Sequence, residues 1–536
     1  MALRGRRRAG GSFVTSRPGM GQLDASSSTV TSRWPQRSRR ALLVSGIAVV
    51  CSAHVGTFDV FFAGKAGAYD VQVTVRPPGV IPGLAQIDIR VGNAGVRRVT
   101  AQAAQWNLGA RGAPAPDEAR AVAGAPGLYS TQLWLMTSAS YAINVAVEGT
   151  QGVGRVVVPV SAVATKRLPM VPGLGWTLAG LGVFLTVGAL TIVRAAAAES
   201  TLPPGEEPDV GRKWRGRGAA AVGGVVVGAL LFGGWNWWNG VDGGYARRIF
   251  RPLHATAAVR SVDGSRVVRI SIDDGRWARR ESSPLVPDHG KMMHLFLVDA
   301  SAMNAFAHLH PTLIDSATFD AVLGTVPSGR YRFYADIVHE SGFAETLTGE
   351  LDVPQATPNE RPADGDDAVW AAPAAAGDTA RLSDGSMLVW HRGPRRSARV
   401  DDPLRFSVVT PDGSPAELEA YLGMPAHALV SRDDGKVFVH LHAGGSFAMA
   451  SQQVLEAIQR GDTLPSVRAG ASPRAVVRSD MAPMAGHTAR RWRGDSLTFP
   501  FAFPSAGQYR LWVQVKRGGV VQTGAFDTVV GEAAAR

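Results

Sequence analysis

The stretch Pro287–Pro311, PDHGKMMHLFLVDASAMNAFAHLHP, decides how the rest of this 536-residue chain is interpreted. It holds four histidines and three methionines within one short segment. A related stretch, GMPAHALVSRDDGKVFVHLH, follows at Gly423–His442. Ten of the twelve histidines of the chain lie between His289 and His487. The sequence therefore indicates a histidine-rich site that occurs twice.

Each stretch contains an H-L-H tripeptide and an earlier histidine in a matching frame. The two equivalent sets are His294, His308 and His310, and His427, His440 and His442. In a β-strand, residues i and i+2 point to the same face. We therefore expect the two histidines of each tripeptide to project together, with the leucine between them on the opposite face. The earlier histidine, on the preceding strand, supplies a third imidazole.

Three imidazoles on one face predict a metal site in each repeat. Further candidate ligands near them are Met293, Met424, His289, His339 and Asp336. Mixed His and Met ligation without cysteine favours copper, with zinc as the second choice. The single cysteine of the chain, Cys51, excludes disulfides and cysteine-based zinc sites.

Two other interpretations stay open. A histidine on a strand is commonly a hydrogen-bonded structural residue, and methionines among apolar neighbours commonly fill a core. On that basis the chain is a metal-independent interaction protein. A zinc-dependent hydrolase would need a base, which Asp336 or Glu340 offers. The sequence contains no G-x-S-x-G, P-loop, Rossmann or H-E-x-x-H motif, so we expect no enzyme.

The net charge of +12 is unevenly distributed. Residues 1–40 contain nine arginines and one aspartate, and the remaining chain is nearly balanced. Arginines placed next to apolar segments report membrane orientation, whereas nucleic-acid binding needs a basic patch on a folded surface. We therefore predict no nucleic-acid partner.

Two apolar runs are long enough to cross a bilayer. The loop between them is rich in Arg and Lys, which favours the cytoplasmic side. Gly224 and Gly228 form a small-xxx-small face for packing the two spans. The expected segments are a disordered basic N-terminus (1–40), a signal or anchor segment (41–53), a first span (171–193), a cytoplasmic loop (194–217) and a second span (218–238). The domains on either side then lie outside the cytoplasm, on the periplasmic side of a membrane whose lipid is a partner.

The remaining chain predicts a mainly β fold. Short alternating strands separated by Gly and Pro are typical of immunoglobulin-like β-sandwiches. We expect three such domains: residues 54–165, the first repeat (residues 253–354) and the second repeat (residues 378–532), with a flexible linker at 355–377. The repeat extends beyond the histidines, because SGRYRF at Ser328–Phe333 is echoed by AGQYRL at Ala506–Leu511. A short helix is expected at Ser451–Arg460.

The first β domain carries a family resemblance. Its segments GLYSTQLWL (Gly127–Leu135) and SYAINVAVEGTQGVGRVVVPV (Ser140–Val160) resemble the YtkA-like and FixH-like extracytoplasmic domains over roughly residues 69–160. The duplicated domains after it are similar to those of uncharacterised bacterial membrane proteins. The resemblance implies work near metal supply or oxidase assembly. The resulting hypothesis is a membrane-anchored copper protein for homeostasis, or for exchange with an extracytoplasmic protein that donates or accepts metal.

Overall fold

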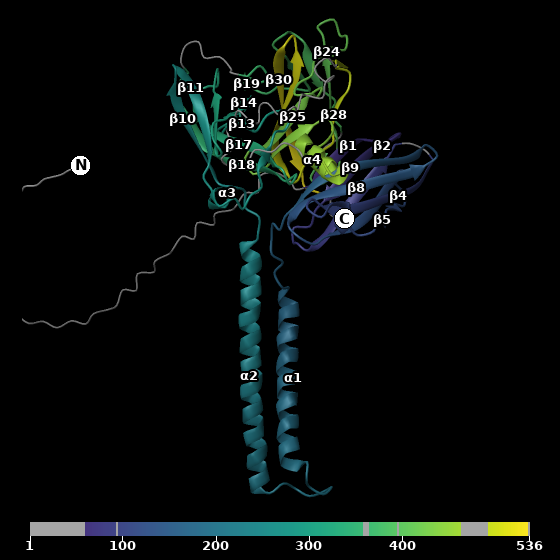
Figure 1. Ribbon diagram of the computed structural model, residues 1–536, viewed down its shortest axis with the longest axis vertical. Helices are drawn as coiled ribbons and strands as arrows, with labels where there is room; N and C mark the ends of the chain where they lie inside the picture. Colours follow the sequence, from purple (N-terminus) through teal and green to yellow (C-terminus); the bar gives the residue numbers. More distant parts are fainter. Residues whose placement is uncertain (1–58, 93–94, 357–363, 394–395, 463–490, 534–536) are drawn as a thin grey trace, which may run out of the picture. The chain divides into compact units, whose positions relative to one another are not determined.

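The computed structural model describes residues 59–92, 95–356, 364–393, 396–462 and 491–533, and is mainly β with antiparallel sheets (Figure 1). This confirms the predicted class. The expectations for residues 1–40 and 41–53 lie outside the described residues.

The first β domain has two sheets that share one core. Their strand orders are β1-β2-β3-β7-β6 and β5-β4-β8-β9. In β3 the residues Ala85, Ile87, Ile89 and Val91 are buried, and the alternate residues point away from the core, as period-two strands require. The elements are β1 (Val60–Ala66), β2 (Tyr69–Arg76), β3 (Gly83–Val91), β4 (Val96–Gln105), η1 (Gly109–Gly112), β5 (Asp117–Glu118), β6 (Arg120–Ala121), β7 (Leu128–Leu135), β8 (Ala139–Gly149) and β9 (Gly152–Ala162).

Two long apolar helices follow, α1 (Pro172–Glu199) and α2 (Val210–Arg247). Each is long and apolar enough to cross a membrane. Both extend into the segment that we predicted as a loop at 194–217, so the connection is shorter than expected.

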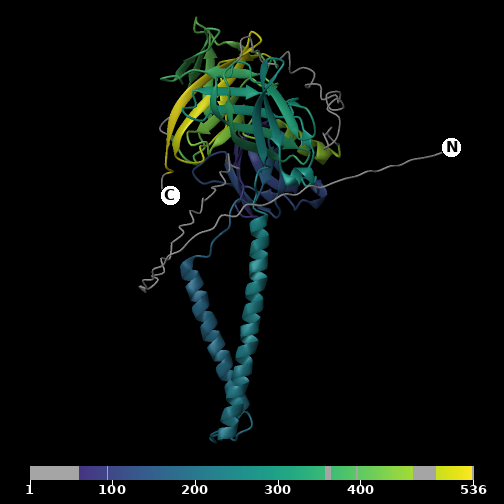
Figure 2. The ribbon, with the colours of Figure 1, turned by 90° about the vertical axis from the view of Figure 1, so that its left-hand side faces the viewer.

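The prediction that Gly224 and Gly228 pack the two helices together is wrong. A Cβ atom at Gly224 or Gly228 would meet nothing within 4 Å. A Cβ at Gly216 would instead lie 2.8 Å from the carbonyl oxygen of Arg194, and one at Gly223 would lie 3.2 Å from Leu190. The close approach therefore occurs near the turn that joins the helices (Figure 2).

The first repeat packs the sheet β10-β11-β16-β15 against the sheet β12-β17-β13-β14-β19, with β18 paired to β17. Its elements are β10 (Ala255–Val262), β11 (Ser265–Ile272), α3 (Gly275–Ala278), β12 (Leu285–Val286), β13 (His294–Asp299), β14 (Ala305–Leu309), β15 (Thr312–Leu313), β16 (Thr318–Val322), β17 (Gly329–His339), β18 (Ala344–Val353) and β19 (Ala368–Ala371). Part of the predicted flexible linker is thus a strand, because β19 pairs with β14 and Trp370 packs on buried aromatic rings.

The second repeat packs the sheet β20-β21-β23-β28 against the sheet β22-β30-β29-β25-β26. The helix expected at Ser451–Arg460 is α4. The elements are β20 (Thr379–Arg381), β21 (Met387–Trp390), β22 (Arg396–Ser397), β23 (Leu404–Val409), β24 (Glu417–Leu418), β25 (His427–Arg432), β26 (Phe438–His442), α4 (Met449–Arg460), β27 (Trp492–Arg493), β28 (Leu497–Phe499), β29 (Gly507–Arg517) and β30 (Val520–Gly531).

The two repeats share details that a common fold explains. In the echoed motif the hydroxyl of Tyr331 donates to the carbonyl of Pro327 at 2.9 Å, and that of Tyr509 donates to the carbonyl of Ser505 at 2.8 Å. The tight turn before the first histidine of each set is also repeated. His289 (φ +50°) and Leu422 (φ +52°) occupy the same left-handed position, each followed by a glycine with positive φ.

The sheets that carry β17 and β29 face each other, and the contacts between them are reciprocal. Tyr334 of the first repeat stacks on Phe438 of the second, with ring centroids 4.0 Å apart. Trp512 of the second repeat, at the position equivalent to Tyr334, stacks on Phe306 of the first at 4.8 Å. Because strand side chains alternate, the residues two positions further along β17 and β29 enter the same interface.

The first β domain is joined to the second repeat beside a predicted ligand, His442. The backbone of Ala63 in β1 donates to the carbonyl of Gly444 at 2.9 Å, and the ring of Phe62 stacks on Phe447. The segment after His442 is therefore held by two domains.

Replacing Trp512 tests whether the interface stabilises the chain. Trp512 is fully buried, so Trp512→Ala should lower the free energy of unfolding by about 3–5 kcal/mol. Trp134→Ala is the matched control, since that ring is 58% exposed and its loss should change stability by less than about 0.5 kcal/mol. Thermal unfolding of the full chain in detergent measures both variants. Equal stability of the two would contradict the structural role of the interface.

Candidate metal centre

Seven histidines from the two repeats form one cluster. The members are His289, His294, His308 and His310 of the first repeat, and His427, His440 and His442 of the second. The sequence predicted two sites, one in each repeat. The structure brings both sets of ligands together in the interface between the repeats.

The strands place these side chains as the i, i+2 rule requires. Leu309 points into the core of the first repeat and Leu441 into the core of the second. The flanking histidines point the other way, into the interface. Within each set of three, ligand nitrogens lie within 4.8 Å of one another, so each set could hold a metal ion. We call His294, His308 and His310 the first triad, and His427, His440 and His442 the second triad.

Backbone carbonyls determine which nitrogen the first histidine of each triad presents. The Nε2 atom of His294 lies 3.2 Å from the carbonyl oxygen of Asp288, and that of His427 lies 3.1 Å from the carbonyl oxygen of Tyr421. A carbonyl only accepts, so in both rings Nε2–H donates. The Nδ1 atom of each ring is left with a free lone pair.

The second histidine of each triad is oriented by a residue of the other repeat. His308 Nδ1–H donates to Gln514 Oε1 at 2.9 Å, and His440 Nδ1 lies 3.4 Å from Asp336 Oδ2. Asp336 and Gln514 are equivalent, because Asp336 pairs with His294 and Gln514 pairs with His427 in their own sheets. Each repeat therefore orients a candidate ligand of its neighbour, leaving the Nε2 of that ring for a metal.

The third histidine of each triad has a buried nitrogen that lacks a partner. His310 Nδ1 bonds to Asp367 Oδ1 at 2.9 Å, and His442 Nδ1–H donates to the carbonyl of Phe447 at 3.0 Å. The Nε2 atoms of both rings are buried and have no hydrogen-bond partner in the described part of the chain. A buried polar atom left unsatisfied costs about 1–3 kcal/mol, which a bound cation would offset.

These assignments leave, in each triad, the lone pair of one Nδ1 atom facing the lone pair of one Nε2 atom. His294 Nδ1 lies 3.2 Å from His308 Nε2, and His427 Nδ1 lies 3.1 Å from His440 Nε2. Without a proton or a cation between them these contacts repel. The spacing suits two nitrogens bound to one ion, since two bonds of about 2 Å at a tetrahedral angle separate the nitrogens by about 3.3 Å.

The environment favours the neutral, metal-binding form of five of these imidazoles. Burial lowers the pKa of His294, His308, His427 and His440 well below the usual value, and neighbouring histidines lower it further. Burial lowers the pKa of His442 to about 4. Burial also raises the pKa of Asp336 to about 7.

The remaining predicted ligands are distributed differently. Met293 is fully buried in the hydrophobic core of the first repeat, so its thioether lies away from the cluster. His339 bonds to the carbonyl of Ser283 and to Glu345, outside both triads. Met424 belongs to the turn that begins at Tyr421, where its backbone amide donates to the carbonyl of Tyr421 at 3.0 Å, and its part as a ligand stays a prediction. The carboxylate of Asp336 lies 3.4 Å from Nδ1 of His440 in the second repeat and accepts a hydrogen bond from the hydroxyl of Thr346.

His289 lies beside the second triad although it belongs to the first repeat. Its ring centroid is 5.2 Å from that of His442 and 5.7 Å from that of His427. Its Nε2 atom is buried and has no hydrogen-bond partner among the described residues. His289, His442 and Asp288 form a further group whose ligand atoms lie within 4.8 Å of one another.

Sequence reasoning missed the residues that orient the cluster. Gln514, Asp367 and Tyr421 each contact a triad histidine, and Tyr421 bridges His308 and the carbonyl of Asp366. The signal for Gln514 was its match with Asp336 in the repeat. Asp367 lies in the predicted linker, where no pattern pointed to it.

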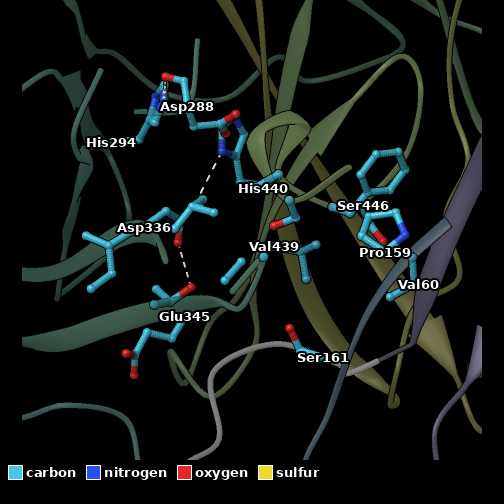
Figure 3. Close-up of a pocket in the computed structure, with 18 of the residues that line it drawn as sticks. Val60, Pro159, Ser161, Asp288, His294, Asp336, Glu345, Val439, His440 and Ser446 are labelled. Carbon is cyan, nitrogen blue, oxygen red and sulfur yellow. Dashed lines mark hydrogen bonds and ion pairs between the residues drawn. The ribbon is translucent and has the colours of Figure 1, made fainter. Parts of the chain in front are cut away.

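A cavity of about 180 Å³ borders both triads. His294, His440 and His442 line it, together with Asp336 and residues of the first β domain such as Val60. Figure 3 shows the ring of His440 directed at the carboxylate of Asp336. The cavity thus borders the cluster where the three β domains meet.

Comparisons with known proteins add little to this geometry. The family model described as "Domain of unknown function (DUF8832)" matches residues 381–532, within the second repeat. No curated protein matches the chain.

Several solved structures align at low similarity. They include latent PorU of Porphyromonas gingivalis (8% identity, 89% of this chain and 34% of that chain, TM-score 0.13) and alpha-2-macroglobulin of Salmonella (10%, 88% and 24%, 0.14). A protein of Corynebacterium diphtheriae described as membrane anchored aligns at 9% identity over 88% of this chain and 94% of that chain, with a TM-score of 0.14. This chain spans about a third or less of the PorU and macroglobulin chains. At these TM-scores the likeness supports no conclusion.

Acid should destabilise the metal-free protein. The histidines of the unfolded chain protonate near pH 6.5, whereas His442 in the folded chain stays neutral down to about pH 4. Over this range the unfolded state binds more protons, so the free energy of unfolding falls as the pH falls. For His442 alone, the free energy of unfolding should fall by roughly 3 kcal/mol between pH 6.5 and about pH 4, at 1.4 kcal/mol for each pH unit.

Protonation of Asp336 has the opposite effect on the free energy of unfolding, so a variant at this position can be compared with the wild type. Its pKa of about 7 is raised above that of an unfolded aspartate, so its protonation favours the folded state as the pH falls below 7. Asp336→Asn should therefore make the acid destabilisation steeper. The unfolding temperature of the chelator-treated chain between pH 7.5 and 5 measures both effects. A stability that stays constant over this range would contradict the burial of neutral histidines.

Proposed function

We propose that this chain is a membrane-anchored protein that binds copper between its two histidine-rich repeats, for metal homeostasis or delivery outside the cytoplasm. One observation carries the proposal. In each triad two imidazole lone pairs face each other at 3.1–3.2 Å, and hydrogen bonds on the far side of the rings fix them in that orientation. A cation between them turns a repulsive contact into two bonds.

The same observation weighs against a purely structural role for the histidines. In a structural network each buried imidazole would find partners for both nitrogens. Here the Nε2 atoms of His289, His310 and His442 have none among the described residues. Such a cluster of buried, incompletely bonded rings is costly without a ligand.

Copper is proposed on the donor set. Every ligand atom offered by the two triads is an imidazole nitrogen. Imidazole suits copper and zinc, and for a given nitrogen site the divalent series favours Cu²⁺ over Zn²⁺. The thioether of Met293 no longer supports the argument, since it lies in the core. Zinc remains the second choice.

The cellular setting rests on the helices and on the resemblance of the first domain. Helices α1 and α2 are suited to crossing a membrane, and the arginines between them favour a cytoplasmic turn. All three β domains then lie on the periplasmic side, in contact with lipid only through their anchor. The first β domain resembles YtkA-like and FixH-like domains, and an immunoglobulin-like fold is expected for all three β domains. Both properties suit exchange of metal with a partner protein. We propose binding and transfer instead of turnover.

Metal analysis of the full chain in detergent tests the proposal. The chelator-treated protein should retain copper after exposure to Cu²⁺ and Zn²⁺ together, followed by desalting. His308→Gln should weaken copper binding at least tenfold, since it removes a ligand while keeping a polar side chain of similar size.

His254→Ala is the matched control, because His254 is exposed and its Nδ1 atom lies 3.2 Å from the carbonyl oxygen of Asp273, away from the cluster. It should bind copper like the wild type. Retention of neither metal would contradict the proposal, as would equal binding by His308→Gln and wild type. Retention of zinc in place of copper would overturn the choice of metal.

A further inference from the structure

We propose that the cluster is one dinuclear centre with two unequal sites, and that His289 of the first repeat completes the site of the second. This inference rests on the proposed function and specifies the arrangement of the metal. It depends on the geometry across the interface and on a difference between the two repeats.

The spacing of the rings shows that the triads are not separate. Within the first triad the ring centroids are 4.6–5.5 Å apart, the largest distance being that between His294 and His308. Across the interface, the centroids of His294 and His440 are 5.6 Å apart, and those of His308 and His440 are 5.8 Å apart. Rings of different repeats are thus about as close as rings of the same triad. With metal–nitrogen bonds of about 2 Å, ions in the two triads lie close enough to share a bridging ligand.

The number of unsatisfied nitrogens favours two ions over one. Each triad has its own pair of facing lone pairs and its own buried Nε2 without a partner, on His310 and on His442. One ion can occupy only one of these positions. The reciprocal support of His308 by Gln514 and of His440 by Asp336 orients both triads equally. Nothing in the arrangement favours a single ion at the midpoint.

His289 makes the sites unequal. The turns that carry His289 and Leu422 are equivalent in sequence position and in backbone conformation. His289 reaches across the interface to His427 and His442, and its Nε2 is buried without a partner in the described chain. The ring of His289 is 6.3 Å from that of His294 in its own repeat, whereas its ligand atom lies within 4.8 Å of that of His442. The second triad therefore has a fourth imidazole beside it. At the equivalent position the second repeat offers only the apolar side chain of Leu422, so the first triad keeps three.

The two sites should therefore differ in how readily they exchange their metal ions. Four protein ligands close a tetrahedral site, whereas three leave a position for an exogenous ligand. The ion of the second triad is then held tightly and the ion of the first triad exchanges. The cavity beside His294 and His440 provides space for a small bridging anion such as hydroxide, which reduces the repulsion between the two cations.

Copper stoichiometry and electron paramagnetic resonance test the inference on the full chain in detergent, with Cu²⁺ alone as the probe. We expect two ions per chain and a spectrum of a magnetically coupled pair, with lost intensity or a half-field transition. One ion per chain, or two ions with the full signal of isolated Cu²⁺, would overturn the dinuclear centre while leaving the copper-binding proposal intact. Binding of no copper would overturn both.

The variant His289→Leu isolates the asymmetry, because it gives the first repeat the residue that the second repeat has in the same turn. We expect the tighter of the two copper affinities to weaken at least tenfold, while the weaker affinity is unchanged. The unfolding temperature of the metal-free variant should match that of the wild type, which separates ligand loss from misfolding. Two unchanged affinities in a correctly folded His289→Leu protein would exclude His289 as a ligand.

Discussion

The interface between the two repeats is the constraint on which the candidate site depends. Strands β17 and β29 present alternate residues to it, and the aromatic pairs Tyr334–Phe438 and Trp512–Phe306 hold the sheets together. Arg332 and Arg510 reinforce the same arrangement, because each donates to a backbone carbonyl of the opposite repeat. The histidines extend this packed face. Their burial follows from the contact between the repeats, and so does the orientation of His308 and His440, whose Nδ1 atoms face Gln514 and Asp336 of the opposite repeat.

The same contact explains how duplication produces a site that one domain lacks. A single repeat supplies one triad on one face of its sheet, and the other repeat covers that face. In the pair, Gln514 orients His308 and Asp336 orients His440, so each repeat completes the outer shell of the other. The described part of the first β domain, from residue 59 onward, contains no histidine, yet it binds the segment Gly444–Phe447 that follows His442. Its role is thus to fix the second triad and to border the cavity, consistent with a scaffold.

The sequence predicted the local parts of this structure and missed the relation between them. The mainly β class, the two apolar helices and the grouping of His308 with His310 follow from periodicity and hydropathy, which are local properties. The assembly of both triads into one cluster depends on which faces of the sheets meet, and no pattern within a strand determines that. Met293 was misjudged for a different reason: its neighbour His294 faces the interface, and strand alternation, a local rule, already turns the methionine toward the core. The helix contacts at Gly216 and Gly223 depend likewise on how two helices cross.

The central claim is that metal lies between the repeats, bound by histidines of both. Anomalous X-ray scattering at the copper absorption edge, from crystals of the copper-loaded chain, tests it most directly. The account predicts two neighbouring anomalous peaks in the interface, one against His294, His308 and His310 and the other against His289, His427, His440 and His442. Peaks that lie outside the interface, or copper-loaded crystals without a peak at either triad, would contradict it.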